Sequence, residues 1–114
     1  MVEAKRVERE KKYLWQERTQ VMSELAHLRE AIQVQINAAP EEADAEITNR
    51  ETNIILIGIL ERRLHHLDTA LQAIERGTYG VCMRCGQPIE AERLAVRPEA
   101  ILRLACQKAV EAGK

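Results

Sequence analysis

The chain has little from which to build an aromatic or a disulfide-stabilised core. Phenylalanine is absent, and the aromatic residues are one tryptophan and two tyrosines. Any core must therefore be aliphatic. The three cysteines form an odd number, which argues against a closed set of disulfides. Because 31% of the residues are also charged, the composition favours long amphipathic helices over a β-sandwich.

Long apolar runs and an excess of one charge are lacking as well. The longest apolar run, Ile54 to Leu60, contains Gly58 and is far shorter than the roughly 20 residues that span a bilayer. The N-terminal sequence MVEAKRVEREKK is too charged for a signal peptide. The net charge of −1 gives no general attraction to nucleic acid or anionic membranes. We therefore expect a cytoplasmic protein with no membrane association.

Two long helices are predicted by the hydrophobic pattern. Residues 3–37 contain neither proline nor glycine. A second helix is expected from Pro40, which suits a first helical turn, to about Arg76, where Gly77 suits the position just after a helix end. Aliphatic residues recur at coiled-coil spacing in both. The stripes are Leu14, Val21, Leu25, Leu28 and Ile32 in the first helix and Ile57, Leu60, Leu64, Leu67, Leu71 and Ile74 in the second.

A short acidic turn between these helices predicts an antiparallel coiled-coil hairpin. We expect residues 1–76 to form the hairpin, with an acidic tip near 38–46, and residues 77–114 to form a separate C-terminal module. A register displaced by one heptad is the main competitor, because the stripes repeat every seven residues. The predicted facing pairs are Leu14 with Leu71, Val21 with Leu64, Leu25 with Leu60, and Leu28 with Ile57.

The C-terminal module opens with the shape of a zinc knuckle, Cys82-Met-Arg-Cys85-Gly86. A structural zinc site takes four thiolate or imidazole ligands in a tetrahedron. Cys106 supplies a third sulfur, but Arg103 stands where a second Cys-x-x-Cys pair would begin, and arginine cannot ligate zinc. Three interpretations stay open: zinc held by three thiolates and an outside ligand, a metal-free module held by packing, or a redox-active Cys82/Cys85 pair.

If packing holds this module, its core should be aliphatic. Turns and short extended pieces are expected over residues 80–97, followed by a short helix from Glu99 to Glu111 with Pro98 at its first position. His65 and His66 are discounted as zinc ligands because they precede the predicted end of the second helix by about 15 Å. No general base has an evident place beside the cysteines, so we do not expect an enzyme. The candidate core residues are Val81, Ile89, Leu94, Ile101 and Leu102.

Residues 70–106, ALQAIERGTYGVCMRCGQPIEAERLAVRPEAILRLAC, closely resemble the C-terminal signature of the DksA/TraR family of bacterial transcription factors. The shared motifs are G-x-Y-G-x-C, C-x-x-C-G, E-R-L and R-P-E-A. The family pattern C-x2-C-x17-C-x2-C falls on Cys82, Cys85, Arg103 and Cys106, so its third ligand is missing. The resemblance implies a mainly α protein: a long helical hairpin, a degenerate zinc-finger-like module and a short C-terminal helix. Zinc would be bound weakly or not at all.

The resemblance also implies a function. Family members bind RNA polymerase and insert the hairpin tip into its secondary channel to modulate initiation, without sequence-specific contact to DNA. The corresponding tip acids here are Glu41, Glu42 and Asp44, of which Asp44 alone matches the family motif D-x-x-D-x-A outright. A solvated acidic turn that has no partner explains the same residues. The alternative function is a structural or oligomerising coiled-coil module with a vestigial finger and no polymerase contact.

Two further contacts concern a nucleotide and a second copy of the chain. The family's alarmone-binding positions correspond to His66, Arg97 and Gln107, and only Arg97 keeps its charge, so tight binding of ppGpp is not expected. Residues 53–60, NIILIGIL, are apolar nearly all round, which is wider than the stripe that a two-helix hairpin buries. This segment is therefore a candidate surface for self-association, unless another element covers it.

Overall fold

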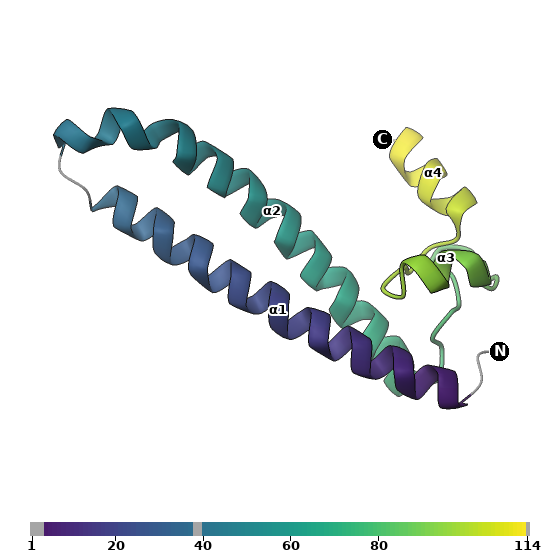
Figure 1. The fold of residues 1–114 in the computed structure, drawn as a ribbon. Helices are drawn as coiled ribbons and strands as arrows, with labels where there is room; N and C mark the ends of the chain where they lie inside the picture. The colour runs from purple at the N-terminus through teal and green to yellow at the C-terminus, as the bar shows by residue number, and fades with distance from the viewer. Residues whose placement is uncertain (1–3, 38–39, 114) are drawn as a thin grey trace. The chain divides into compact units, whose positions relative to one another are not determined.

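The structure is a computed structural model that describes the backbone of residues 4–37 and 40–113, and the side chains of 7–37 and 50–113. Its helices are α1 (Ala4–Ile36), α2 (Pro40–Arg76), α3 (Ala91–Val96) and α4 (Leu104–Ala112) (Figure 1). Within these residues the β-pairing consists of an isolated bridge between Val81 and Pro88. The expected mainly α fold is confirmed. No helix of the described part combines the length and hydropathy needed to span a membrane.

Helices α1 and α2 begin and end close to where the sequence predicts. Gly77, immediately after α2, has a φ of +74°, a conformation that costs glycine little and other residues more. The Gly77 N–H donates to the Ile74 carbonyl at 3.2 Å, and the Thr78 N–H donates to the Ala73 carbonyl at 2.8 Å. These two bonds are those of a Schellman motif, which satisfies carbonyls left unpaired at a helix end.

The chain divides into two compact units. The first unit contains residues 1–18 and 66–114. Within it, α1 and α2 bury an aliphatic seam that includes Leu14 and Leu67, both 0% exposed. Two ion pairs connect the same helices: Lys11 with Glu75 at 3.4 Å, and Arg18 with Asp68 at 2.5 Å.

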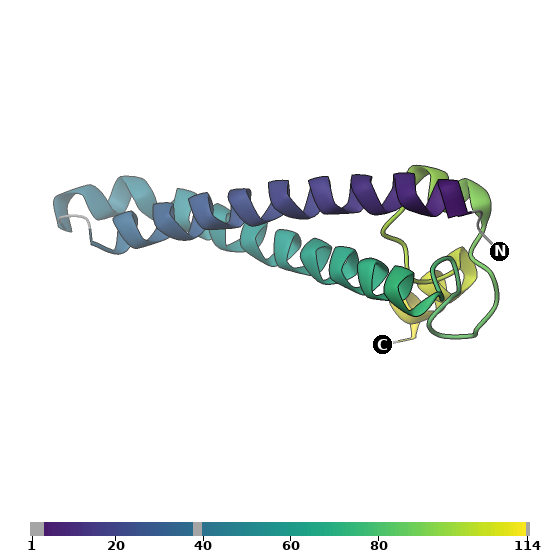
Figure 2. The same cartoon turned by 90° about the horizontal axis from the view of Figure 1, so that it is seen from below.

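The second unit contains residues 19–65. Here Val21 and Leu25 of α1 are 2% and 1% exposed, and the α2 stripe residues from Ile57 to Leu64 are half-buried. An ion pair of 2.8 Å joins Arg29 to Glu61. Within this unit α1 and α2 lie side by side in both views (Figures 1 and 2).

The ion pairs of the first unit fit the predicted hairpin register. Arg18 lies one helical turn after Leu14, and its partner Asp68 lies one turn before Leu71. An antiparallel pair with Leu14 facing Leu71 requires this offset, whereas a displacement of one heptad would bring Arg18 near residue 61 or 75. In the second unit the facing pairs stay a prediction.

The C-terminal module differs from the sequence prediction in its helices. Helix α3 occupies part of the segment in which turns were expected, and α4 begins at Leu104 instead of Glu99. The carbonyls that would extend α4 backwards are used elsewhere. The Ile101 carbonyl accepts the Met83 N–H at 2.9 Å, and the Leu102 carbonyl accepts the Arg93 Nε–H at 2.9 Å. These long-range bonds hold residues before α4 out of the helix.

The core of this module contains two of the expected aliphatic residues. Ile89 and Leu94 are buried together with Cys82 and Cys106, and Leu102 packs partly buried against them. Ile101 is half-buried. The prediction was wrong for Val81, which is 41% exposed. Val81 precedes the buried Cys82 in an extended segment, where successive side chains point to opposite sides.

A crosslinking experiment tests the register in the second unit. Cysteines introduced by Val21→Cys with Leu64→Cys should form a disulfide under mild oxidation, because facing seam residues approach closely enough for one. Peptide mapping without reduction distinguishes this bond from any that involve the native cysteines. The control pairs Val21→Cys with Ile57→Cys, one heptad away. Preferential crosslinking in the control would show that the displaced register is correct.

Candidate metal centre

Cys82 and Cys85 lie on a tight turn whose shape is set by hydrogen bonds and by a glycine. The Cys82 N–H donates to the Gln87 carbonyl at 2.8 Å, and the Gly86 N–H donates to the Cys82 carbonyl at 2.9 Å. Gly86 has a φ of +77°, while an added Cβ would meet no atom within 4 Å. Glycine is therefore favoured at this position by backbone conformation and not by lack of space.

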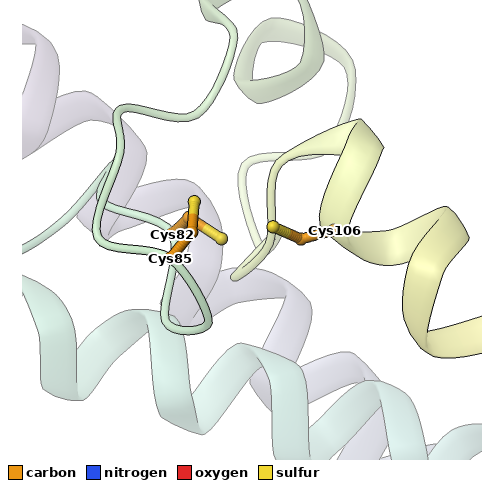
Figure 3. A group of neighbouring side chains, drawn as sticks. All are labelled: Cys82, Cys85 and Cys106. Atoms are coloured by element: carbon orange, nitrogen blue, oxygen red, sulfur yellow. The ribbon is translucent and has the colours of Figure 1, made fainter.

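Cys106 comes from the first turn of α4. The start of this helix is held by Glu90, whose Oε1 accepts the Leu104 N–H at 3.2 Å. The three cysteine sulfurs converge and lie within 4.8 Å of one another (Figure 3). Cys82 and Cys106 are buried, and Cys85 is exposed. All three predicted sulfur ligands are thus brought together.

Arg103 places its guanidinium beside these sulfurs. Its Nε–H donates to Cys85 Sγ at 3.1 Å, and its positive charge also interacts with Cys106. The bond to Cys85 is the main cause that raises the pKa of Arg103 above its ordinary value, so the side chain stays cationic. Sequence reasoning identified Arg103 as a missing ligand. The structure shows that it is a hydrogen-bond donor to the cluster.

The environment of the sulfurs separates their pKa values. Burial acts to raise the pKa of Cys82, but backbone N–H groups of Arg103, Cys85 and Arg84 outweigh it and hold the pKa at about 6. Burial raises the pKa of Cys106, and the neighbouring sulfurs of Cys85 and Cys82 raise it further. Of these two buried thiols, Cys82 therefore ionises more readily than Cys106.

The residues present do not fit a closed tetrahedral zinc site. Zinc in such a site needs four electron-pair donors, and a guanidinium offers none while it repels a dication. Among the described residues the metal-ligating group consists of Cys82, Cys85 and Cys106, and neither His65 nor His66 joins it. The ligand set is therefore incomplete, as the sequence predicts.

The residues at the alarmone positions lie around one cleft. His66, Arg97 and Gln107 line a cleft of about 310 Å³ in the first unit. Its charge is mixed, and the Gln107 amide donates to the Glu111 carboxylate at 2.8 Å. Sequence reasoning placed no other charged residue in this cleft. Arg93, for instance, lies one helical turn before Arg97 in a segment not recognised as helix. The other charged residues of the lining are Arg93, Glu99, Lys108 and Glu111.

The side chains of Glu41, Glu42 and Asp44 lie outside the part of the chain whose side chains the structure describes. Their backbone belongs to the first turns of α2. Their role as tip acids stays a prediction.

Restoring the fourth cysteine should create a tight zinc site. The wild-type protein is expected to hold zinc at low occupancy and to change little in melting temperature with EDTA, because the aliphatic seam of the helices supplies its stability. Arg103→Cys completes the ligand set, and a structural zinc can contribute on the order of 10 kcal/mol. Zinc content per chain and melting with and without EDTA measure both expectations.

Arg103→Ser is the matched control, since it removes the guanidinium without adding a ligand. It should bind no more zinc than the wild type. One tightly held zinc per wild-type chain, with a large fall in melting temperature on chelation, would contradict the conclusion that the site is incomplete.

Comparison with known proteins places these features in a family. The model of the prokaryotic dksA/traR C4-type zinc finger matches residues 77–112. General stress protein 16O of Bacillus subtilis is 38% identical over 65 residues, which cover 57% of this chain and 40% of that protein. An uncharacterised protein of Aquifex aeolicus is 44% identical over 48 residues and is matched over 33% of its length. The chain thus spans less than half of these two relatives.

A third relative is matched over most of both chains. The uncharacterised protein YlyA of Bacillus subtilis is 31% identical over 90 residues, 72% of this chain and 69% of that protein. The structure of transcription factor DksA2 from Pseudomonas aeruginosa has a TM-score of 0.80 and 22% identity, covering 96% of this chain and 86% of that one. The Dks protein of Chlamydia trachomatis, an RNA polymerase binding protein and transcriptional regulator, gives a TM-score of 0.63 at 19% identity, covering 99% and 95%. The two solved structures share the fold, and together with the sequence relatives they show that the chain belongs to the DksA/TraR family.

Proposed function

We propose that this protein is a non-enzymatic regulator of transcription that binds RNA polymerase. The observation that carries the proposal is the combination of an α1–α2 hairpin with a dksA/traR finger in one chain, an arrangement that it shares with DksA2 and Dks along nearly its whole length. The protein would act where the polymerase is, in the bacterial cytoplasm. It would act on the enzyme and not on a DNA sequence.

The hairpin tip is the proposed contact with the polymerase. Residues 38–48 carry four acids, Glu41, Glu42, Asp44 and Glu46, and no basic residue. In the family such acids enter the secondary channel, so that negative charge lies near the catalytic centre and alters the lifetime of promoter complexes. Asp44, the position that matches the family motif, would make the main contact here.

The hairpin suits this role because its cohesion does not depend on metal. Buried leucines and ion pairs between α1 and α2 hold the helices together in each unit. Burying a leucine side chain contributes about 1.5–3 kcal/mol, whereas exposed ion pairs contribute up to about 1 kcal/mol each. The hairpin can therefore keep its acidic tip in place even though the finger has an incomplete set of zinc ligands.

We propose at most weak binding of ppGpp at the cleft of His66, Arg97 and Gln107. Arg97, Arg93 and Lys108 supply positive charge for phosphates. Glu99 and Glu111 line the same cleft, and their carboxylates oppose the approach of a polyanion. Regulation by this protein should accordingly depend little on the alarmone.

The proposal is tested with purified bacterial RNA polymerase. The protein should comigrate with the polymerase and change transcription from initiation-sensitive promoters. Asp44→Asn should reduce this effect several-fold, while the free energy of unfolding changes by no more than about 0.5 kcal/mol, because the proposed role of Asp44 is in contacting polymerase and not in packing. Transcription assays and thermal melting give the two readouts.

Glu24→Gln is the matched control, because it removes one exposed carboxylate of α1 outside the tip. It should leave regulation unchanged. Equal effects of the two substitutions would show that Asp44 has no special role. Absence of any complex with the polymerase would favour the alternative of a structural coiled-coil module.

A further inference from the structure

Helix α2 presents a second apolar face in addition to the seam with α1. Glu51, Ile55, Gly58, Ile59 and Arg62 recur at helical spacing and form what we call the outer stripe. Ile55 and Ile59 are 63% and 48% exposed. The neighbouring Ile54 and Leu56 are also exposed. All these residues belong to the second unit, and they are largely uncovered in the single chain.

Within one chain, neither steric space nor backbone conformation accounts for glycine at position 58 of this stripe. A Cβ built on it would meet only the Arg62 guanidinium, at 3.8 Å, and its φ is not positive. Neither limited space nor backbone conformation thus requires glycine. In a helix interior glycine costs about 1 kcal/mol relative to alanine. A glycine on an exposed face, between isoleucines, permits the close approach of another backbone.

The charges at the two ends of the outer stripe are opposite. Glu51 lies at its N-terminal end and Arg62 at its C-terminal end, with the isoleucines and Gly58 between them. A second copy related by a twofold axis perpendicular to α2 places its own α2 antiparallel to the first. Glu51 then faces Arg62 of the second copy, and Ile55 faces Gly58 and Ile59 of the second copy. The stripe is therefore complementary to itself, which is the requirement for a symmetric dimer interface.

We infer that the outer stripe is a self-association surface, on which a second copy of this chain docks with α2 antiparallel to α2. The apolar centre would supply the affinity, Gly58 the close approach, and the Glu51–Arg62 pairs the antiparallel orientation. If the protein also regulates polymerase as proposed, the dimer would hold it in a form too wide for a channel that admits one hairpin. That consequence depends on the proposed function, but the dimer itself does not.

Sedimentation equilibrium of the full chain tests the dimer. The wild type should show a reversible monomer–dimer equilibrium. Ile55→Glu should abolish the dimer because it buries a charge at the centre. Met22→Glu is the matched control, as Met22 is 45% exposed on α1 outside the stripe. It should leave the equilibrium unchanged, and circular dichroism should show both variants folded.

Gly58→Ala separates the dimer contact from helix stability. Alanine favours the helix, so the melting temperature of the dilute monomer should rise. The added methyl group should hinder close approach and weaken dimerisation several-fold. If Gly58 affected only helix stability, Gly58→Ala would not raise the melting temperature and at the same time weaken dimerisation.

Charge reversal tests the orientation. Glu51→Arg and Arg62→Glu should each weaken self-association roughly tenfold, since each places like charges opposite one another twice. An equimolar mixture of the two variants should associate as well as the wild type, because every facing pair in the mixed dimer is again of opposite sign.

A monomer at all accessible concentrations would overturn the inference. Self-association that is insensitive to Ile55→Glu and to both charge reversals would also overturn it, by placing the interface elsewhere. Loss of polymerase binding by Ile55→Glu in a protein that never dimerises would identify the stripe as a polymerase contact instead. Failure of the wild type to bind polymerase would reject the proposed function and leave the dimer test unaffected.

Discussion

Burial of an aliphatic seam between α1 and α2 is the interaction on which the rest of this structure depends. Without phenylalanine or a complete metal site, leucine and valine must supply the cohesion. Leu14 and Leu67 are fully excluded from water in the first unit, and Leu25 nearly so in the second. Each contributes a few kcal/mol to stability. The ion pair of Arg18 with Asp68 borders the seam, and the same guanidinium lies over the Trp15 ring at 5.5 Å from its centroid. These polar contacts add less energy than the seam, but they help to select one register.

In the C-terminal module the Arg103 guanidinium performs part of the structural role that zinc has in a complete finger. The turn carrying Cys82 and Cys85 and the first turn of α4 carrying Cys106 come from different parts of the chain (Figure 3). Zinc would join them with bonds to four ligands. Here Arg103, at the start of α4, joins them by the hydrogen bond from its guanidinium to the sulfur of Cys85. A hydrogen bond to a charged group is weaker than a metal–thiolate bond. The buried contacts of Ile89 and Leu94 and the Met83–Ile101 backbone bond therefore carry more of the cohesion.

Features set by local sequence were predictable, and those set by distant hydrogen bonds were not. The aliphatic repeat, Pro40 and Gly77 act within a few residues, so the two long helices and their ends could be predicted. Helix α4 was predicted to begin at Glu99, because proline at 98 favours a helix start there. Its actual start at Leu104 depends on Met83 and Arg93, which bind the carbonyls of Ile101 and Leu102 from elsewhere in the fold. Spacing located the three sulfurs correctly, but it could not show that the residue at the fourth position donates a hydrogen bond to them.

The seam face and the outer face of α2 both reflect how much apolar surface a two-helix hairpin can bury. A two-helix hairpin can bury only one side of each helix. In the second unit the α2 residues of the seam, Ile57, Leu60 and Leu64, are only half-buried, whereas Leu67 in the first unit is completely buried. The outer stripe with Ile55 and Ile59 therefore lies on the part of α2 that a single chain covers least. A second α2 helix packed over Gly58 would exclude water from the outer stripe, while α1 covers the seam face of α2. Self-association through the outer stripe would thus bury apolar side chains that the isolated chain leaves exposed, whereas the proposed polymerase contact uses acidic residues of the same unit.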